Sequence, residues 1–298
     1  MDLKILDINF FNPNVIACHL IKTSEGPILI ETGPDSVFMN LEKALNDNGY
    51  QVSDIKHVFV THIHLDHSGA AWHFAKEGAK IYVHGRGAPH IIAPEKLMKS
   101  AAMIYGDDMD RLWGTVENVD ENLVYAIEDQ EVITIGDTKI KAIETPGHAS
   151  HHHAYQIEDI LITGDVTGNR INLGPILPPT PPPDINVELW QESIQKIRDI
   201  NPSTIYPTHF GGQNGITEIN AHLEELENTL LDWTEWIGVR VKDGKTDEEI
   251  IPEFEEYASN ILKSANVSEI DYRSYELSDP FFMNVGGLTR YWRKFRLS

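Results

Sequence analysis

The feature that most constrains the fold is a run of polar side chains that directly follows a short apolar strand. Residues Thr61–Gly69 read THIHLDHSG and place three histidines and an aspartate within six positions. His62 and His64 are two positions apart, so an extended backbone turns both imidazoles to the same side. Asp66 and His67 follow where the chain must bend, so they can face a second point in space. Imidazole nitrogens with a carboxylate oxygen suit zinc, with iron or manganese as alternatives, and the run therefore predicts a metal site.

Three further polar residues stand in the same kind of place, at or just past the end of an apolar strand. They are His148, Asp165 and His209, which follow the expected strands 139–145, 160–163 and 204–207. Each strand would carry its polar residue to one edge of a sheet, where loops are free to converge. With the first run they supply five histidines and two carboxylates. That set is enough for two metal ions that share one carboxylate.

The order of elements predicts a layered α/β fold, because short apolar runs alternate with helical patterns through the first two thirds of the chain. The expected strands are 3–9, 15–22, 27–31, 57–60, 80–83, 139–145, 160–163 and 204–207, and the expected helices are 37–48, 70–77, 94–105 and 187–200. Turn residues within 3–31 favour antiparallel pairing there, so the sheet is not expected to be purely parallel. Asp35 and Asn186 lie just before a helix and are expected to act as N-caps.

The hydrophobic pattern of the sequence changes after about residue 215. Apolar positions recur at helical spacing from 216 to 241, and further helical patterns follow at 247–262 and about 271–278. A basic stretch, 289–296, ends the chain. We therefore expect a main domain over 1–215 and a helical extension over 216–298 that packs on it.

Composition limits the partners of this chain. It has 24 Lys and Arg against 46 Asp and Glu, a net charge of −22, which repels polyanions, so no nucleic acid is expected. The single cysteine, Cys18, excludes an internal disulfide and a multi-cysteine metal cluster, and we expect it in the core. No apolar run approaches 18 residues and the first residues lack the pattern of a signal peptide, so no membrane and a cytoplasmic location are expected. A small molecule is the expected substrate, and a homo-oligomer is left open.

The seven ligand-type residues resemble the pattern of the metallo-β-lactamase superfamily. They are His62, His64, Asp66, His67, His148, Asp165 and His209. The resemblance covers roughly residues 1–215 and implies a four-layer αββα sandwich with a dinuclear metal site at one edge. Within the superfamily the chain is similar to the glyoxalase-II-like branch of thioester hydrolases, which also carries a helical C-terminal addition. It is more closely similar to a group of prokaryotic members, on residues 147–152, 179–184 and 208–211.

The resemblance also implies how the ligands divide between two metal ions, with zinc the expected metal. It places His62, His64 and His148 on one ion, Asp66, His67 and His209 on the other, and Asp165 between them. Two divalent ions can lower the pKa of a shared water toward about 7. A bridging hydroxide would then attack a thioester or lactone-type carbonyl of a small metabolite. Asp66 would orient that hydroxide and is the expected catalytic residue.

Five more residues are expected to support a ligand or to line the substrate pocket. They are Thr61, Arg86, His152, Asp184 and Thr208. The two threonines each adjoin a ligand and could hydrogen-bond it. Asp184 belongs to the proline-rich run, which could form a pocket wall, and Arg86 could contact an anionic group. The neighbours of His152, at 151 and 153, are expected at the surface.

Other functions stay open on the sequence alone. A phosphodiesterase or ribonuclease of the same fold is one alternative, although the charge of −22 argues against RNA. A mononuclear iron persulfide dioxygenase uses similar ligands and would bind one iron per chain. β-Lactam hydrolysis is disfavoured, because no export signal is expected. A non-catalytic scaffold is also disfavoured, because all seven ligand types are present.

Overall fold

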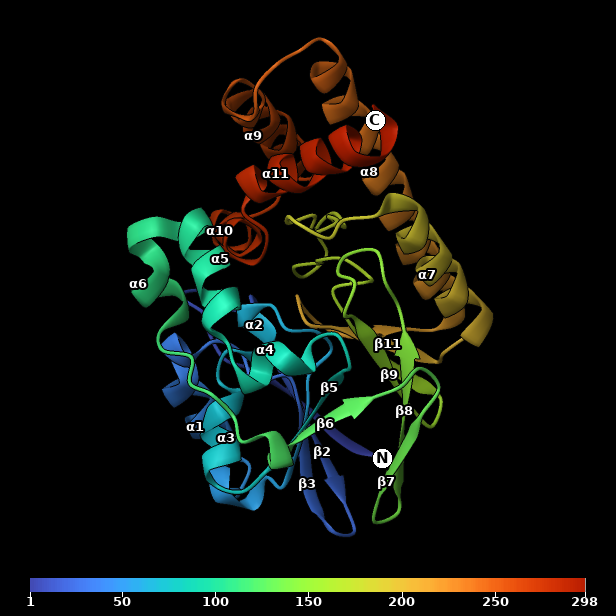
Figure 1. The fold of residues 1–298 in the computed structure, drawn as a ribbon. Coiled ribbons are helices and arrows are strands. Elements are labelled where there is room, and N and C mark those ends of the chain that lie inside the picture. The colour runs from blue at the N-terminus through green and yellow to red at the C-terminus, as the bar shows by residue number, and fades with distance from the viewer. Residues whose placement is uncertain (298) are drawn as a thin grey trace. The chain divides into compact units, whose positions relative to one another are not determined.

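The structure is a computed structural model that describes residues 1–297, and these form two compact units. The first unit comprises residues 1–144 and 151–158, and the second comprises 145–150 and the chain from 159 onward. The chain therefore passes from the first unit to the second, returns for eight residues and leaves again. Figure 1 traces this path from the blue N-terminus to the red C-terminus.

The first unit contains a mixed sheet of six strands in the order β1-β2-β3-β4-β5-β6. The strands are β1 (Asp2–Asp7), β2 (Ala17–Thr23), β3 (Gly26–Ile30), β4 (His57–Phe59), β5 (Lys80–His84) and β6 (Val124–Ile127). The first three pair antiparallel, and β3 to β6 pair parallel. Ile28, Leu29 and Ile30 are fully buried, as is usual where both faces of a parallel strand are covered. The expectation of a sheet that is not purely parallel is confirmed.

Helices connect the parallel strands of this unit. They are α1 (Phe38–Asp47), α2 (Leu65–Ser68), α3 (Ala71–Lys76), α4 (Ala88–Ile92), α5 (Glu95–Tyr105) and α6 (Met109–Trp113), with short 3-10 turns at 35–37, 52–54, 106–108 and 121–123. On α1 the buried residues Phe38, Leu41 and Leu45 recur at three- and four-residue spacing. That spacing makes one apolar stripe, and burying each such side chain contributes about 1.5–3 kcal/mol.

Three antiparallel strands complete the first unit. They are β7 (Val132–Ile135), β8 (Thr138–Glu144) and β9 (His153–Ile157). The backbone N–H of His153 donates to the carbonyl of Thr61 at 2.8 Å. The start of β9 is thereby tied to the histidine-rich segment that follows β4.

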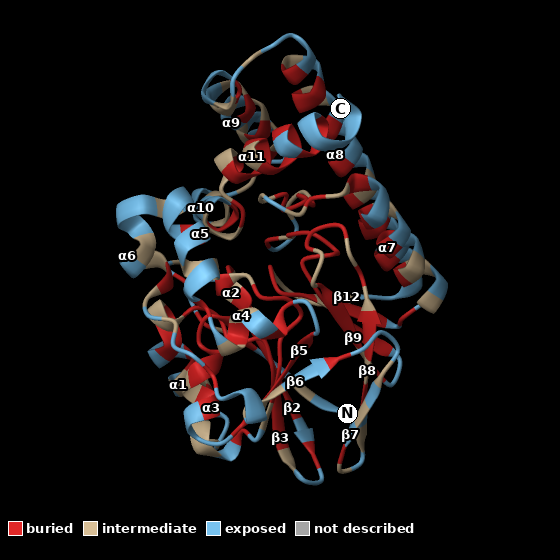
Figure 2. Ribbon diagram, viewed as in Figure 1, coloured by how far each residue is buried: buried red, intermediate tan, exposed pale blue. Residues whose placement is uncertain are grey.

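The second unit combines three strands with long helices. Strands β10 (Ile160–Gly164) and β11 (Thr204–Pro207) pair parallel, with α7 (Val187–Ile200) between them in sequence, and β12 (Gln213–Asn214) pairs antiparallel with β11. The helices that follow are α8 (Ile216–Lys242), α9 (Asp247–Ser264), α10 (Glu269–Ser278) and α11 (Phe281–Tyr291), with a π-helical turn at 292–296. Buried and exposed positions alternate along α7 and α8, as expected of amphipathic helices (Figure 2).

The expected fold class, an αββα sandwich with C-terminal helices, is confirmed: the strands belong to two mixed sheets and helices pack on them. The boundary predicted at residue 215 stays a prediction, and α8 begins at Ile216. Asn186 caps α7 as expected, because its side chain accepts from the backbone N–H of Leu189 at 3.0 Å. Cys18 is buried in β2, as expected. Through residue 297 the structure holds no helix with the length and apolar character that crossing a bilayer requires.

Several expectations were wrong or incomplete. Asp35 does not cap α1, whose N-cap is Val37; its carboxylate instead accepts from the backbone N–H of Thr115 and lies 2.6 Å from Nε2 of His73. His153 is fully buried because it starts a strand, so its expected surface position is wrong. The elements not predicted are β6, β7, β9, β12, α2, α4, α6 and α11. Most of them are short, and α11 contains the glycine pair 286–287, which disfavours a helix from propensity alone.

Candidate metal centre

Four of the predicted ligands lie together in the first unit. The chain leaves β4, runs extended to His64 and then enters α2, which carries Asp66 and His67. Nε2 of His62 lies 2.9 Å from Nδ1 of His64, and Nε2 of His67 lies 3.5 Å from Oδ2 of Asp66. The ring centroids of His62 and His67 are 3.9 Å apart. Within this unit the predicted run therefore forms one compact group of nitrogen and oxygen ligands.

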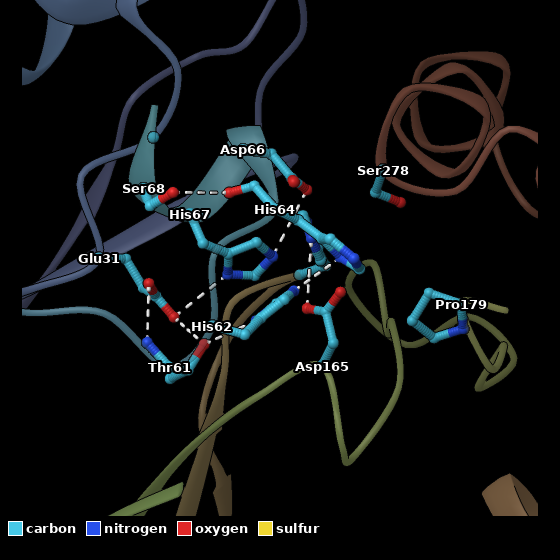
Figure 3. A network of polar contacts seen from close by, with 12 residues as sticks. Glu31, Thr61, His62, His64, Asp66, His67, Ser68, Asp165, Pro179 and Ser278 are labelled. Carbon is cyan, nitrogen blue, oxygen red and sulfur yellow. Dashed lines mark hydrogen bonds and ion pairs between the residues drawn. The ribbon is translucent and has the colours of Figure 1, made fainter. Parts of the chain in front are cut away.

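A residue that the sequence reasoning missed organises this group. Glu31, at the end of β3, is fully buried and accepts from the hydroxyl of Thr61 at 2.5 Å and from Nδ1 of His67 at 3.1 Å (Figure 3). The Thr61 hydroxyl also lies 3.0 Å from Nδ1 of His62. Since Thr61 gives its one hydroxyl hydrogen to Glu31, Nδ1 of His62 is the donor in that contact. Thr61 therefore bonds the side chain of a candidate ligand, and its supporting role stays a prediction.

The consequence of this network is a fixed tautomer for two histidines. With the proton on Nδ1 in both His62 and His67, the lone pair of each ring is on Nε2, the nitrogen that faces the other candidate ligands. Carboxylates that hold the other ring nitrogen of a metal-binding histidine orient the ring and raise its basicity. The sequence feature that could have identified Glu31 is a carboxylate directly after an apolar strand. The backbone φ of Glu31, +68°, is also uncommon for a residue with a side chain and marks a specialised position.

The other three predicted ligands lie together in the second unit. His148, Asp165 and His209 are each at most 3% exposed. Nε2 of His148 lies 3.4 Å from Oδ2 of Asp165, and Nε2 of His209 lies 3.5 Å from Oδ1. The two oxygens of one carboxylate thus face two different histidines. A carboxylate that bridges two metal ions needs this arrangement.

Local packing fixes His148 in place. Its Nδ1 donates to the carbonyl of Pro179 at 2.8 Å, which again leaves the lone pair on Nε2. Gly147 has a φ of +134°, and a Cβ there would overlap the backbone of Trp190. Trp190 is itself held by the bond from its Nε1 to the carbonyl of Val166 at 2.8 Å, and its ring meets the His148 ring edge-on at 5.6 Å. Only glycine fits at position 147, so the loop delivers His148 in one conformation.

The remaining predicted residues have mixed surroundings, and their roles stay predictions. His152 is fully buried, with its ring centroid 5.0 Å from that of His62. Asp184 accepts from the hydroxyl of Ser150 at 2.5 Å, which ties the proline-rich run to the loop of His148. Thr208 is buried, and its backbone N–H bonds the Gly164 carbonyl. Arg86 is exposed.

Burial holds three buried groups of the first unit, outside the predicted ligand set, in their neutral forms. Burial lowers the pKa of His19 to about 3. Burial, with a smaller contribution from Glu31, raises the pKa of the Cys18 thiol well above its usual value. Burial also raises the pKa of Tyr155, whose hydroxyl donates to the Val60 carbonyl at 2.8 Å. A thiol that stays protonated is neither a nucleophile nor a metal ligand, so Cys18 is a packing residue.

The donor set fits a divalent metal. It consists of imidazole nitrogens and carboxylate oxygens, the ligands that zinc takes in catalytic sites. Three of the histidines have Nδ1 bound to a protein oxygen, and the same three present Nε2 toward other ligand-type atoms. In each unit the residues of histidine and aspartate type could therefore contribute to holding metal ions.

Comparison with known proteins places the chain in a family. A family model described as the metallo-beta-lactamase superfamily matches residues 12–209. A metallo-beta-lactamase fold-containing protein of Sulfurisphaera tokodaii is 28% identical over 176 residues, which are 58% of this chain and 66% of that protein. A metallo-beta-lactamase family protein of Thermus thermophilus, 19% identical, superimposes with a TM-score of 0.71 over 98% of this chain and 93% of its own. That structure shows the same fold.

Two further relatives carry the names of hydrolases. An N-acyl homoserine lactonase of Bacillus thuringiensis is 23% identical over 213 residues, which are 61% of this chain and 75% of that protein. An atrochrysone carboxyl ACP thioesterase of Aspergillus fumigatus is 26% identical over 159 residues, which are 52% of this chain and 38% of that protein. The chain spans about half to two thirds of the length of the first curated relatives that it matches.

Proposed function

Because the chain belongs to the metallo-β-lactamase superfamily, we propose that it is a metal-dependent hydrolase that cleaves a thioester or lactone-type ester of a small metabolite. The observation that carries the proposal is the pair of ligand sets, one in each unit, with ring nitrogens and carboxylate oxygens presented together. Relatives named as a lactonase and a thioesterase support an ester-type carbonyl as the target.

In this proposal the two ligand sets hold two metal ions, and zinc is the proposed metal for both. The first ion would be held by His62, His64 and His148, the second by Asp66, His67 and His209, and Asp165 would be shared. Support comes from Asp165, whose two oxygens face different histidines. Further support comes from the contact between Nε2 of His62 and Nδ1 of His64, since two ring nitrogens 2.9 Å apart can share one cation.

The protein's own groups have distinct tasks in this reaction. Bound zinc supplies a Lewis acid and lowers the pKa of water toward about 7. Asp66, whose side chain is 19% exposed, would orient the attacking water and hold its proton. Glu31 and the Pro179 carbonyl keep the protons of His67 and His148 on Nδ1, so that Nε2 serves the metal. The tautomers are therefore set by the fold before any metal arrives.

A hydrolysis screen with metal-loaded protein tests the proposal. It compares thioesters, lactones, phosphodiesters and β-lactams, with the His62→Ala variant as the blank. We expect turnover of a thioester or a lactone, two metal ions per chain, and loss of turnover in the variant. Equal turnover by both proteins would mean that the activity does not depend on the metal site. One iron per chain would instead favour the dioxygenase alternative.

A further inference from the structure

We propose that helix α11 is a clamp that sets the orientation of His148, and that Asn284 is the positioning residue through which it acts. The inference rests on the proposed function in one respect, that His148 holds a metal ion. It gives a role to α11, one of the C-terminal helices, which carry none of the predicted ligands. Every contact that it uses lies within the second unit.

The first link joins the His148 ring to a peptide group of the proline-rich run. Nδ1 of His148 donates to the Pro179 carbonyl at 2.8 Å, and the ring is 1% exposed. Nε2 on the other side of the ring lies 3.4 Å from Oδ2 of Asp165. Because the imidazole is rigid, the position of the Pro179 oxygen decides where Nε2 points. A shift of that oxygen moves the proposed metal-binding nitrogen.

The second link joins the same peptide group to α11. The carbonyl of Pro179 and the N–H of Thr180 belong to one planar peptide unit. The Thr180 N–H donates to Oδ1 of Asn284 at 2.7 Å, and the Thr180 hydroxyl donates to the same oxygen at 2.6 Å. Thr180 and Asn284 are both fully buried. One rigid peptide unit thus accepts a hydrogen bond from His148 at one end and donates one to Asn284 at the other.

Further contacts hold the run along α11. The chain packs so closely at Gly287 that a Cβ there would overlap the Thr180 carbonyl. Nε of Arg290 donates to the Pro183 carbonyl at 3.1 Å. Asn284, Gly287 and Arg290 recur every third residue, so they lie along one side of the helix. The prolines of the run have fixed φ angles, which leaves the segment few ways to absorb a displacement.

The experiment compares Asn284→Leu with the parent protein. Leucine fills a similar volume but offers no acceptor, so Thr180 loses the bonds of both its backbone N–H and its hydroxyl to α11. Hydrogen-bond partners of metal-binding histidines contribute about 10–100-fold to metal affinity, and Asn284 acts one peptide further away, so we expect about a tenfold rise in the zinc Kd. In metal-free protein we also expect the Nδ1 proton of His148 to exchange faster with solvent, measured by NMR and assigned with His148→Gln.

Two variants separate positioning from general stability. Asn284→Asp keeps an oxygen for both Thr180 bonds and should retain parent zinc affinity and slow proton exchange. Thr289→Val is the control, because Thr289 is a buried polar residue of the same helix whose hydroxyl bonds Asp247 and Gly286 and not the run. It should lower the melting temperature without changing either readout. If Asn284→Leu does not fold, Gly287→Ala, which pushes on the Thr180 carbonyl, takes its place.

The outcomes distinguish this inference from the proposed function. Parent values for zinc affinity and proton exchange in a folded Asn284→Leu or Gly287→Ala protein would overturn the clamp. Equal changes in Thr289→Val would do the same, since the effect would then follow stability alone. A parent protein that binds no zinc would refute the proposed function. The exchange rate of the His148 proton would still decide whether α11 holds the ring.

Discussion

The substitution Glu31→Gln tests the idea that a buried carboxylate sets the tautomers of the first ligand group. In the parent, Oε1 of Glu31 accepts from both Thr61 and His67. A glutamine removes the charge and places a donor beside the backbone N–H of Thr61, which lies 3.4 Å from Oε2. If the amide turns to relieve that conflict, it donates toward His67 and favours the proton on Nε2. Either orientation weakens His67 as a ligand.

The size of the effect follows from the two bonds to Oε1. Hydrogen bonds to a charged group contribute about 1.5–3 kcal/mol and neutral ones about 0.5–1.5 kcal/mol. Loss of the charge at two bonds therefore costs about 2–3 kcal/mol. At about 1.4 kcal/mol per tenfold change, this predicts a zinc affinity about 30–140-fold lower. Mutation of such hydrogen-bonding partners in other metal sites gives losses of about 10–100-fold, which agrees.

Zinc titration of the metal-free protein is the assay, with the melting temperature as a check on folding. Glu144→Gln is the matched control, because Glu144 also pairs with a histidine, Nε2 of His84 at 3.0 Å, outside the predicted ligand set. The control should bind zinc as the parent does. Parent affinity in a folded Glu31→Gln protein would refute the tautomer argument. An equal loss in the control would show that the charge acts at long range instead.

Three further predictions concern single side chains. Gly147→Ala should cost about 2 kcal/mol or more and weaken zinc binding, because a Cβ overlaps Trp190; chemical denaturation with zinc titration checks it, and parent stability would contradict it. Asp66→Asn should reduce turnover far more than the melting temperature, and turnover at the parent rate would remove its proposed role. Burial lowers the pKa of His222 to about 4, so the unfolded chain binds a proton between pH 6.5 and 4 that the folded protein does not. Stability should fall by up to about 3 kcal/mol as pH drops through that window, and His222→Gln should reduce the fall in denaturant titrations.

Residues at strand ends were predictable because they obey a simple rule. Apolar strands such as Ile160–Gly164 are recognised by their composition, and the polar residue that follows each of them emerges at a sheet edge. The same rule applied to Glu31 would have identified it, since it follows β3 directly. It was missed because a lone carboxylate carries no metal signature, whereas a run of histidines does.

Contacts between distant segments could not be predicted from local patterns. The bond from His148 to Pro179 spans 31 positions and that from Thr180 to Asn284 spans 104, so neither leaves a trace in spacing or periodicity. His153 was misplaced for a related reason, because its burial depends on strand pairing with β8, where it lies opposite Glu144, rather than on its own polarity. Asp35 shows the same limit, because its carboxylate accepts from the backbone N–H of Thr115, far along the chain, and does not cap α1.

The path of the chain has a consequence for how the protein can be built and dissected. Six residues, 145–150, belong to the second unit but lie in sequence between two strands of the first, and they include His148. No single cut, at any peptide bond, yields two fragments that each keep a whole unit. During synthesis the first unit cannot be finished before residue 158 leaves the ribosome, by which time a piece of the second has already been made. A deletion from either terminus therefore leaves a fragment that lacks part of a unit or carries part of the other one. Point substitutions in the intact polypeptide are the way to study each unit separately.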